Sequence, residues 1–119
     1  MSGVIDAIVK KKLAEGPITI NSDYTSDVID CSGVEDTFAV QLEYSNGNGA
    51  VDIVTFLEVS VNGQVFVPIQ DTEFFDTDDT GAQIWEVTGR GVNYLRVGII
   101  VNSGQFDLDV IEFSGSRRH

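Results

Sequence analysis

The chain has 119 residues, enough for one domain with its own core, and its hydrophobic fraction of 42% is that of a folded globular protein. Its net charge is −12, and residues 13–116 hold eighteen of the nineteen acids against two arginines. A body this acidic repels phosphate backbones, which argues against nucleic-acid binding by the domain surface.

Residues 3–15 have the spacing of a short amphipathic helix. An acid lies early, lysines lie late and Gly16-Pro17 follow as a stop, and the apolar face would consist of Ile5, Ile8, Val9 and Leu13. So short a helix is unstable alone, so we expect it to pack on the domain or on another subunit. Residues 16–25 would then form a linker.

Strand patterns begin at Ile18. Residues 37–44 alternate, and the apolar face holds Phe38, Val40, Leu42 and Tyr44. The following SNGNGA, residues 45–50, is rich in turn formers and is expected to be a flexible loop.

The segment 57–69, LEVSVNGQVFVPI, predicts a β-hairpin. Two alternating apolar runs meet at Asn62-Gly63, a dipeptide that tolerates the positive φ angles of a type I′ turn. Pro68 cannot donate to a ladder, so the second strand should end there or lie at a sheet edge.

Three more strands are expected at 83–87, 93–101 and 105–113, joined by TGRGV and NSG. In the last strand the apolar positions change parity from Phe106, Leu108 and Val110 to Ile111 and Phe113. A β-bulge near 110–111 would explain that change.

These short strands favour an all-β protein, an antiparallel β-sandwich of the jelly-roll kind with a short N-terminal helix or arm. We expect a helix or arm and linker over 1–21, a sandwich over 22–114 and a basic tail over 115–119. The predicted core consists of Phe38, Val40, Leu42, Leu57, Val59, Leu95, Val97, Ile99, Phe106 and Leu108, joined by Trp85.

The sequence offers little catalytic chemistry, and we expect no enzyme. The only histidine is His119, there is no nucleophile elbow or phosphate-binding loop, and GRG at 89–91 is more natural as a turn. Nineteen acids would allow a carboxylate pair, but most alternate outward or occupy turns. Cys31, the only cysteine, is expected to be a small buried hydrophobe.

The acidic stretch 71–87 contains a weak calcium candidate. Asp76, Asp78 and Thr80 precede Gly81 with the spacing that opens a calcium loop, but Val87 stands where the bidentate glutamate belongs. The favoured alternative is a surface loop whose side chains bond nearby backbone amides, so no cofactor is expected. The adjacent Phe74 and Phe75 would pin this loop to the sandwich edge or to a neighbouring subunit.

Aromatic residues suggest a sugar-binding face as a further possibility. The stacking candidates are Tyr24, Tyr44, Trp85 and Tyr94. Tyr44 and Trp85 lie in alternating strands, where a core or rim position is commoner.

Three blocks together resemble the small β-sandwich virion proteins of tailed bacteriophages, which include decoration, cement and tail-associated proteins. The blocks are SDVIDCSGVEDTFAVQLEY, LEVSVNGQVFVPI and GAQIWEVTGRGVNYLRVGIIVNSG. The similar region covers about residues 22–113 and its motifs are strand patterns, not catalytic signatures.

This resemblance implies a non-enzymatic virion structural protein, most directly a capsid decoration or cement protein that binds neighbouring head subunits. It would form a homo-oligomer in the virion and would be soluble in the host cytoplasm before assembly. The alternatives are a neck, tail or fibre-associated protein, or a carbohydrate-binding module for host attachment.

The partner contacts expected under this reading are Ile5, Ile8, Lys10, Lys11, Lys12, Phe74, Phe75, Arg117 and Arg118. Arg96 is expected to pair with a carboxylate, such as Glu43 or Glu86, in a structural role. No stretch is long enough for a membrane span, and the lysines at 10–12 follow the apolar run 4–9, so neither a membrane segment nor a secretory leader is expected.

Overall fold

The computed structural model describes residues 6–32, 34–88 and 93–118, with the side chains of 6–8, 35, 36, 117 and 118 left undescribed. Over these residues the protein is all-β and antiparallel, as the sequence predicts, with no helix. Its eight strands belong to one sheet. They are β1 (Asp6–Ile20), β2 (Tyr24–Thr25), β3 (Ile29–Asp30), β4 (Val34–Ser60), β5 (Val67–Pro68), β6 (Phe74–Asp76), β7 (Gly81–Thr88) and β8 (Tyr94–Arg118).

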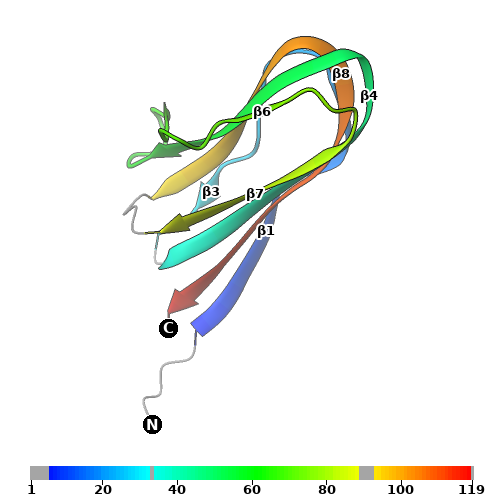
Figure 1. Cartoon of the computed structure of the whole chain (residues 1–119). Coiled ribbons are helices and arrows are strands. Elements are labelled where there is room, and N and C mark those ends of the chain that lie inside the picture. The colour runs from blue at the N-terminus through cyan, green and yellow to red at the C-terminus, as the bar shows by residue number, and fades with distance from the viewer. Residues whose placement is uncertain (1–5, 33, 89–92, 119) are drawn as a thin grey trace.

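The two longest strands, β4 and β8, pair with each other along their lengths and bend together, so that one sheet folds over into two layers (Figure 1). The bend in β4 lies in SNGNGA, where positive φ angles occur at Asn46, Gly49 and Ala50. Gly104 in β8 also has a positive φ, and a Cβ there would lie 2.9 Å from the backbone of Val51. The expected loop is therefore a bend through which strand pairing continues.

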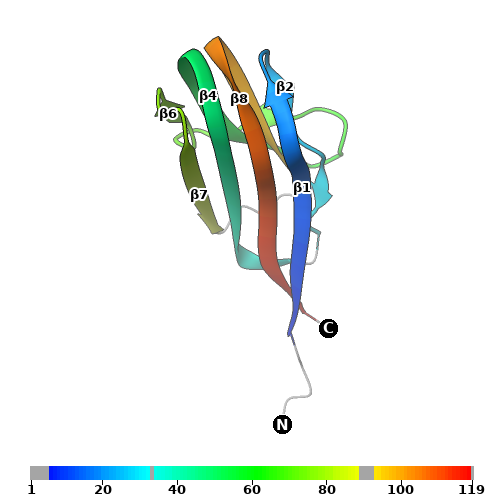
Figure 2. The ribbon, with the colours of Figure 1, turned by 90° about the vertical axis from the view of Figure 1, so that its right-hand side faces the viewer.

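Each layer contains one half of β4 and one half of β8. The first layer has the order β1-β8-β4-β7, and Figure 2 shows β1 and β7 at its opposite edges. In the second layer, β2 and β3 pair with β8 on one side, and β5 and β6 pair with β4 on the other. This arrangement is compatible with the predicted β-sandwich.

The core lies between the layers and matches the predicted set closely. Every predicted core residue is buried except Val59, which packs against the core while partly exposed. The core further includes Leu13, Ile53, Ile111 and Phe113 at 0% exposure. Cys31 is buried as expected. The parity change in the last strand is also confirmed, because the register against β4 shifts where Glu43 faces Val110 and Tyr44 faces Leu108.

Hydrogen bonds join the two layers along both open sides. On one side the backbone N–H of Asp27 donates to the carbonyl of Leu13 at 2.9 Å. On the other, the indole Nε1 of Trp85 donates to the carbonyl of Thr72 at 2.7 Å. A buried hydrogen bond also runs from the Thr55 hydroxyl to the Gln83 amide oxygen. Thr55 and Gln83, two polar residues buried in the core, are thus paired with each other.

The predicted N-terminal helix is wrong. Residues from Asp6 onward form β1, which pairs antiparallel with β8 as far as Ile20, while residues 3–5 lie outside the described part. Register shifts occur between Lys12 and Ala14 and again between Glu15 and Ile18. Val9 and Leu13 both pack on the core and lie four residues apart, a spacing that shares one face in a strand as well as in a helix, so the pattern imitates a helix.

The predicted tail and linker are likewise parts of the sheet. β8 continues to Arg118 and pairs Gly115 with Val9 and with Phe38, so the expected boundary between 114 and 115 falls inside a strand. His119 lies outside the described residues. The expected linker 16–25 includes the end of β1 and all of β2.

The predicted hairpin is confirmed in its pairing but not in its turn. Glu58 pairs with Pro68 and Val59 with Val67, and β5 lies at the end of the strand order, as Pro68 indicated. The connection is longer than two residues, because no strand is assigned from 61 to 66.

Candidate interaction surface

The connection between β4 and β5 is held by side chains instead of a two-residue turn. The hydroxyl of Ser60 accepts hydrogen bonds from the backbone N–H groups of Asn62 and Gly63, at 3.2 and 2.9 Å. The Asn62 side-chain oxygen accepts from Gln64 N and Val65 N, at 2.8 and 3.1 Å. Gly63 has a φ of 77°, which suits glycine. These bonds fix the shape of the loop without using its apolar side chains.

Those apolar side chains form an open pocket, which we call the valine pocket. Val61, Val65 and Val67 are 71%, 66% and 57% exposed. Together with Val59, Ser60 and Asn62 they line a hollow of about 360 Å³. Val67 pairs with Val59, so the two share a face of the sheet, whereas Val61 and Val65 belong to the connection between β4 and β5. The valine pocket was not foreseen as a site, although its alternation was visible in the sequence.

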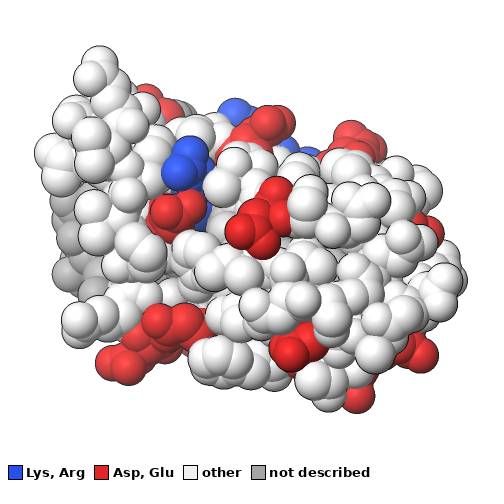
Figure 3. Space-filling view, turned by 90° about the horizontal axis from the view of Figure 1, so that it is seen from above, with Lys and Arg blue, Asp and Glu red and all other residues white. Residues whose placement is uncertain are grey.

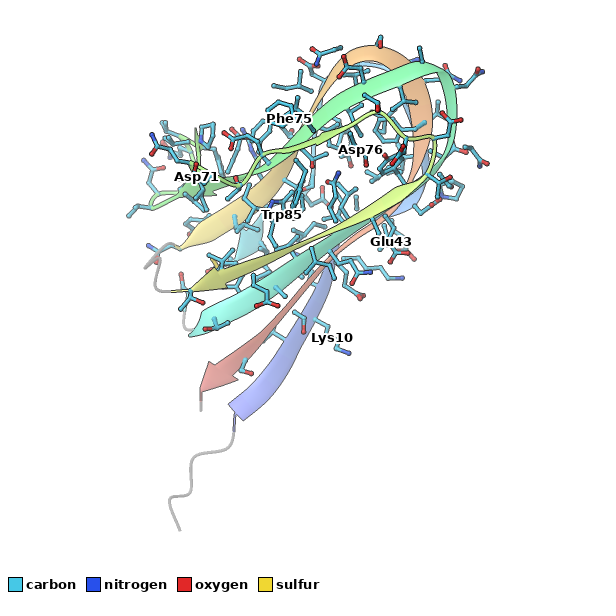
Figure 4. All side chains as sticks on the ribbon, in the orientation of Figure 1. Lys10, Glu43, Asp71, Phe75, Asp76 and Trp85 are labelled. Atoms are coloured by element: carbon cyan, nitrogen blue, oxygen red, sulfur yellow. The ribbon has the colours of Figure 1, made fainter. Side chains whose placement is uncertain are left out.

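The two predicted contact phenylalanines point in different directions from the edge strand β6. Phe74 pairs with Thr55 in register and packs against Trp85, with ring centroids 5.3 Å apart. Phe75 pairs with Val54 and is 78% exposed on the outer side of the second layer (Figure 4). Phe74 thus holds the segment to the sandwich edge, whereas Phe75 remains open to a partner.

The segment proposed as a calcium candidate has the hydrogen bonds expected of a surface loop. A carboxylate oxygen of Asp76 accepts a hydrogen bond from the backbone N–H of Asp78 at 2.9 Å, as in an Asx-turn. Where residues are described, no group of three or more acidic, histidine or cysteine side chains is placed to hold a metal ion. Asp76 instead faces Tyr44, whose hydroxyl donates to the carbonyl of Asp78 at 3.1 Å.

Burial raises the pKa of Tyr44, and the hydrogen bond with Asp76 and the charges of Asp76, Asp78 and Asp79 raise it further. The phenol therefore stays protonated as an anchor for the acidic loop. It is not available as a general base at neutral pH.

Two of the proposed sugar-stacking residues belong to the core. Tyr44 is 1% exposed and Trp85 is 5% exposed, so neither ring can offer a face to a ligand. Trp85 lies between the layers (Figure 4). Tyr94 packs beside Gly63, where a Cβ would come within 3.3 Å of its ring.

Tyr24 is half-buried and lines a shallow groove of about 310 Å³ with Phe56, Glu58 and Arg96. Burial raises its pKa, with a smaller contribution from the charge of Asp27.

Arg96 pairs with a carboxylate as predicted, but with Glu58 instead of Glu43 or Glu86. Its Nε bonds the carboxylate of Glu58 at 3.1 Å, and its guanidinium lies 4.2 Å from the ring centroid of Phe66. Glu58 and Arg96 face each other across β4 and β8, while Glu43 and Glu86 belong to the first layer. The sequence shows that Arg96 faces outward but not which strand lies beside it.

The predicted basic contacts lie along neighbouring strands. Lys10, Lys11 and Lys12 are exposed on β1, and Lys12 forms an ion pair with Glu15 at 3.2 Å. Arg117 pairs with Ala7 and Arg118 with Asp6 across β8 and β1. The backbone of Ile8 lies in the same ladder, whereas Ile5 falls outside the described residues. Acidic side chains, by contrast, are scattered over the face seen from above (Figure 3).

No protein-family model matches the sequence, and no curated protein sequence does either. Among solved structures, the SPBc2 prophage-derived protein YomS has a similar fold, with a TM-score of 0.55 at 7% identity over 94% of this chain and 95% of that one. A carbohydrate-binding module, TmCBM61 in complex with β-1,4-galactotriose, gives a TM-score of 0.48 at 11% identity, covering 94% and 88% of the two chains. At such identities the likeness concerns the fold alone.

The described residues include no helix that could cross a membrane.

Proposed function

We propose that this chain is a non-enzymatic structural protein of a tailed-phage particle, and specifically a decoration or cement protein that binds neighbouring head subunits. The observation that carries the proposal is the valine pocket, where three valines remain largely exposed on a strongly acidic protein. The full-length similarity in fold to the prophage-derived YomS agrees with a phage origin.

The valine pocket has the chemistry of a docking site for an apolar side chain of a partner protein. Covering its three exposed valines would contribute about 3 to 5 kcal/mol, which is a substantial share of a specific interface. Its rim carries Ser60 and Asn62, whose side-chain oxygens already accept hydrogen bonds within the loop. A partner can therefore bury the pocket without leaving those groups unpaired.

The charge of the body supports the same role. A net charge of −12 makes copies and finished particles repel one another except where a specific contact is formed. In this proposal the protein is soluble in the host cytoplasm and joins the virion after the head has assembled. Its partners are head subunits, with the neck, tail and fibres as the alternative location.

Co-sedimentation tests this proposal. The purified chain is mixed with heads, or separately with tails, from particles that lack it. We expect binding to heads, and we expect Val65→Asp to abolish it because a charge would then occupy the pocket. Val28→Asp is the matched control, since Val28 is 36% exposed and lies between β2 and β3, outside the valine pocket.

Binding to tails alone would move the assignment to the neck or tail. Binding to neither particle, or equal binding by Val65→Asp and the parent chain, would contradict the proposal. Circular dichroism of both variants would show whether they are folded.

A further inference from the structure

The first layer ends in two edge strands of different charge. β1 pairs only with β8 and β7 only with β4 among the described residues. Lys10, Lys11 and Lys12 form the basic stretch of β1, and Figure 4 shows Lys10 projecting from that strand. On β7 the exposed side chains include Ile84, at 55%, and Glu86.

The strand directions allow one copy to continue the layer of another. Each pair in the order β1-β8-β4-β7 is antiparallel, so β1 and β7 of one molecule run in opposite directions. A second copy placed beside the first in the same orientation brings its β1 antiparallel to the β7 already present. The layer would then extend with its alternation intact.

The register places complementary side chains in the same rows. One row across the layer joins Lys10, Ser114, Ala39 and Glu86. The next row on the same face of the layer joins Lys12, Glu112, Gln41 and Ile84. In a continued layer of the same register, Glu86 of one copy faces Lys10 of the next, and the carbon stem of Lys12 lies over Ile84.

We propose that the chain assembles with copies of itself, head to tail, by pairing β7 of one copy with β1 of the next. The charges favour this contact over a symmetric one, because two β1 strands would bring lysines together. Such a contact repeats, and the twist of each sheet determines whether it closes into a ring or continues as a filament. This surface is separate from the valine pocket, so the inference does not depend on the proposed function.

Lysines on an edge strand can also prevent that strand from pairing with another sheet. In the described part of the chain Lys10 has no ion-pair partner, whereas Lys12 has Glu15. The complementary acid on the other edge distinguishes an assembly contact from simple protection, and charge reversal tests it directly.

The experiment compares the association of the full chain and its variants by sedimentation velocity across a concentration series. We expect the parent chain to self-associate, and less strongly at high ionic strength. Lys10→Glu and Glu86→Lys should each raise the dissociation constant about tenfold, because each replaces an attractive cross-strand pair by a repulsive one.

The decisive sample is an equimolar mixture of the two variants. The changed edge of each variant complements the changed edge of the other, and their unchanged edges keep the parental pair, so the mixture should associate more tightly than either variant alone. Matched controls are Lys11→Glu, which alters the opposite face of β1, and Asp52→Lys, which alters an exposed acid at the bend. Both should associate like the parent chain.

A parent chain that stays monomeric throughout would overturn the proposal and leave the lysines as a protective device. Association unaffected by Glu86→Lys would also overturn it, as would a mixture that remains dissociated while circular dichroism shows both variants folded.

Discussion

Replacing Leu13 with alanine should destabilise the protein by about 3 to 5 kcal/mol, if β1 is an integral part of the sandwich. Leu13 is 0% exposed, and Leu13→Ala removes its Cγ and both Cδ atoms from the core. The loss of buried carbon costs about 2 to 3 kcal/mol, and the cavity that remains adds to this cost.

Urea denaturation followed by circular dichroism measures the change in free energy of unfolding, with an unchanged m-value as evidence that the native fold is retained. Lys11→Ala is the control: Lys11 is exposed two residues away, and its removal should change stability by no more than about 0.5 kcal/mol. A loss below about 1 kcal/mol for Leu13→Ala would refute the reasoning. The N-terminal segment would then be a dispensable arm.

Tyr44→Phe should cost about 1 kcal/mol near neutral pH, because the hydrogen bond to the Asp78 carbonyl is lost. The pKa of Tyr44 is higher in the folded chain than in the unfolded chain, where tyrosine ionises near pH 10. The difference in free energy of unfolding between the parent chain and Tyr44→Phe should therefore be constant below about pH 10 and shrink as the pH rises above that value. Urea titrations at neutral and alkaline pH measure this difference. A double-mutant cycle with Glu58→Gln and Arg96→Met should give a coupling of about 0.5 to 1.5 kcal/mol, since the pair is largely shielded from solvent, and zero coupling would show that the contact is incidental. Asn62→Ala should lower the free energy of unfolding by about 1 kcal/mol through loss of the two backbone contacts that shape the loop, and no change in thermal midpoint would contradict that role.

The strands of the fold were predictable where alternation is clean and the chain is straight. Residues 83–87 alternate strictly and lie within β7, and the segment 37–44 is part of β4. The same reasoning failed in β1, because Val9 and Leu13, four residues apart, share one face in a strand as well as in a helix. Pairing with β8, almost a whole chain length away, determines this segment, and no local pattern reports such a contact.

The candidate site was predictable only in part. The sequence named Phe74 and Phe75 together as candidate contacts without showing that Phe75 is the more exposed of the two, and the exposure of Val65 and Val67 depends on tertiary packing. The partner of Arg96 depends on which halves of β4 and β8 face each other. The bend in SNGNGA determines that, and its turn-forming residues are equally compatible with a loop.

The strands β4 and β8, which both layers share, determine how this protein unfolds. Since each passes through the bend and contributes to both layers, neither layer can detach while the other stays intact (Figure 1). Amide protons near Val40 and near Leu57, on opposite sides of the bend, should exchange with solvent through the same global event. A molecule with this exchange behaviour offers proteases few partly opened forms to cleave.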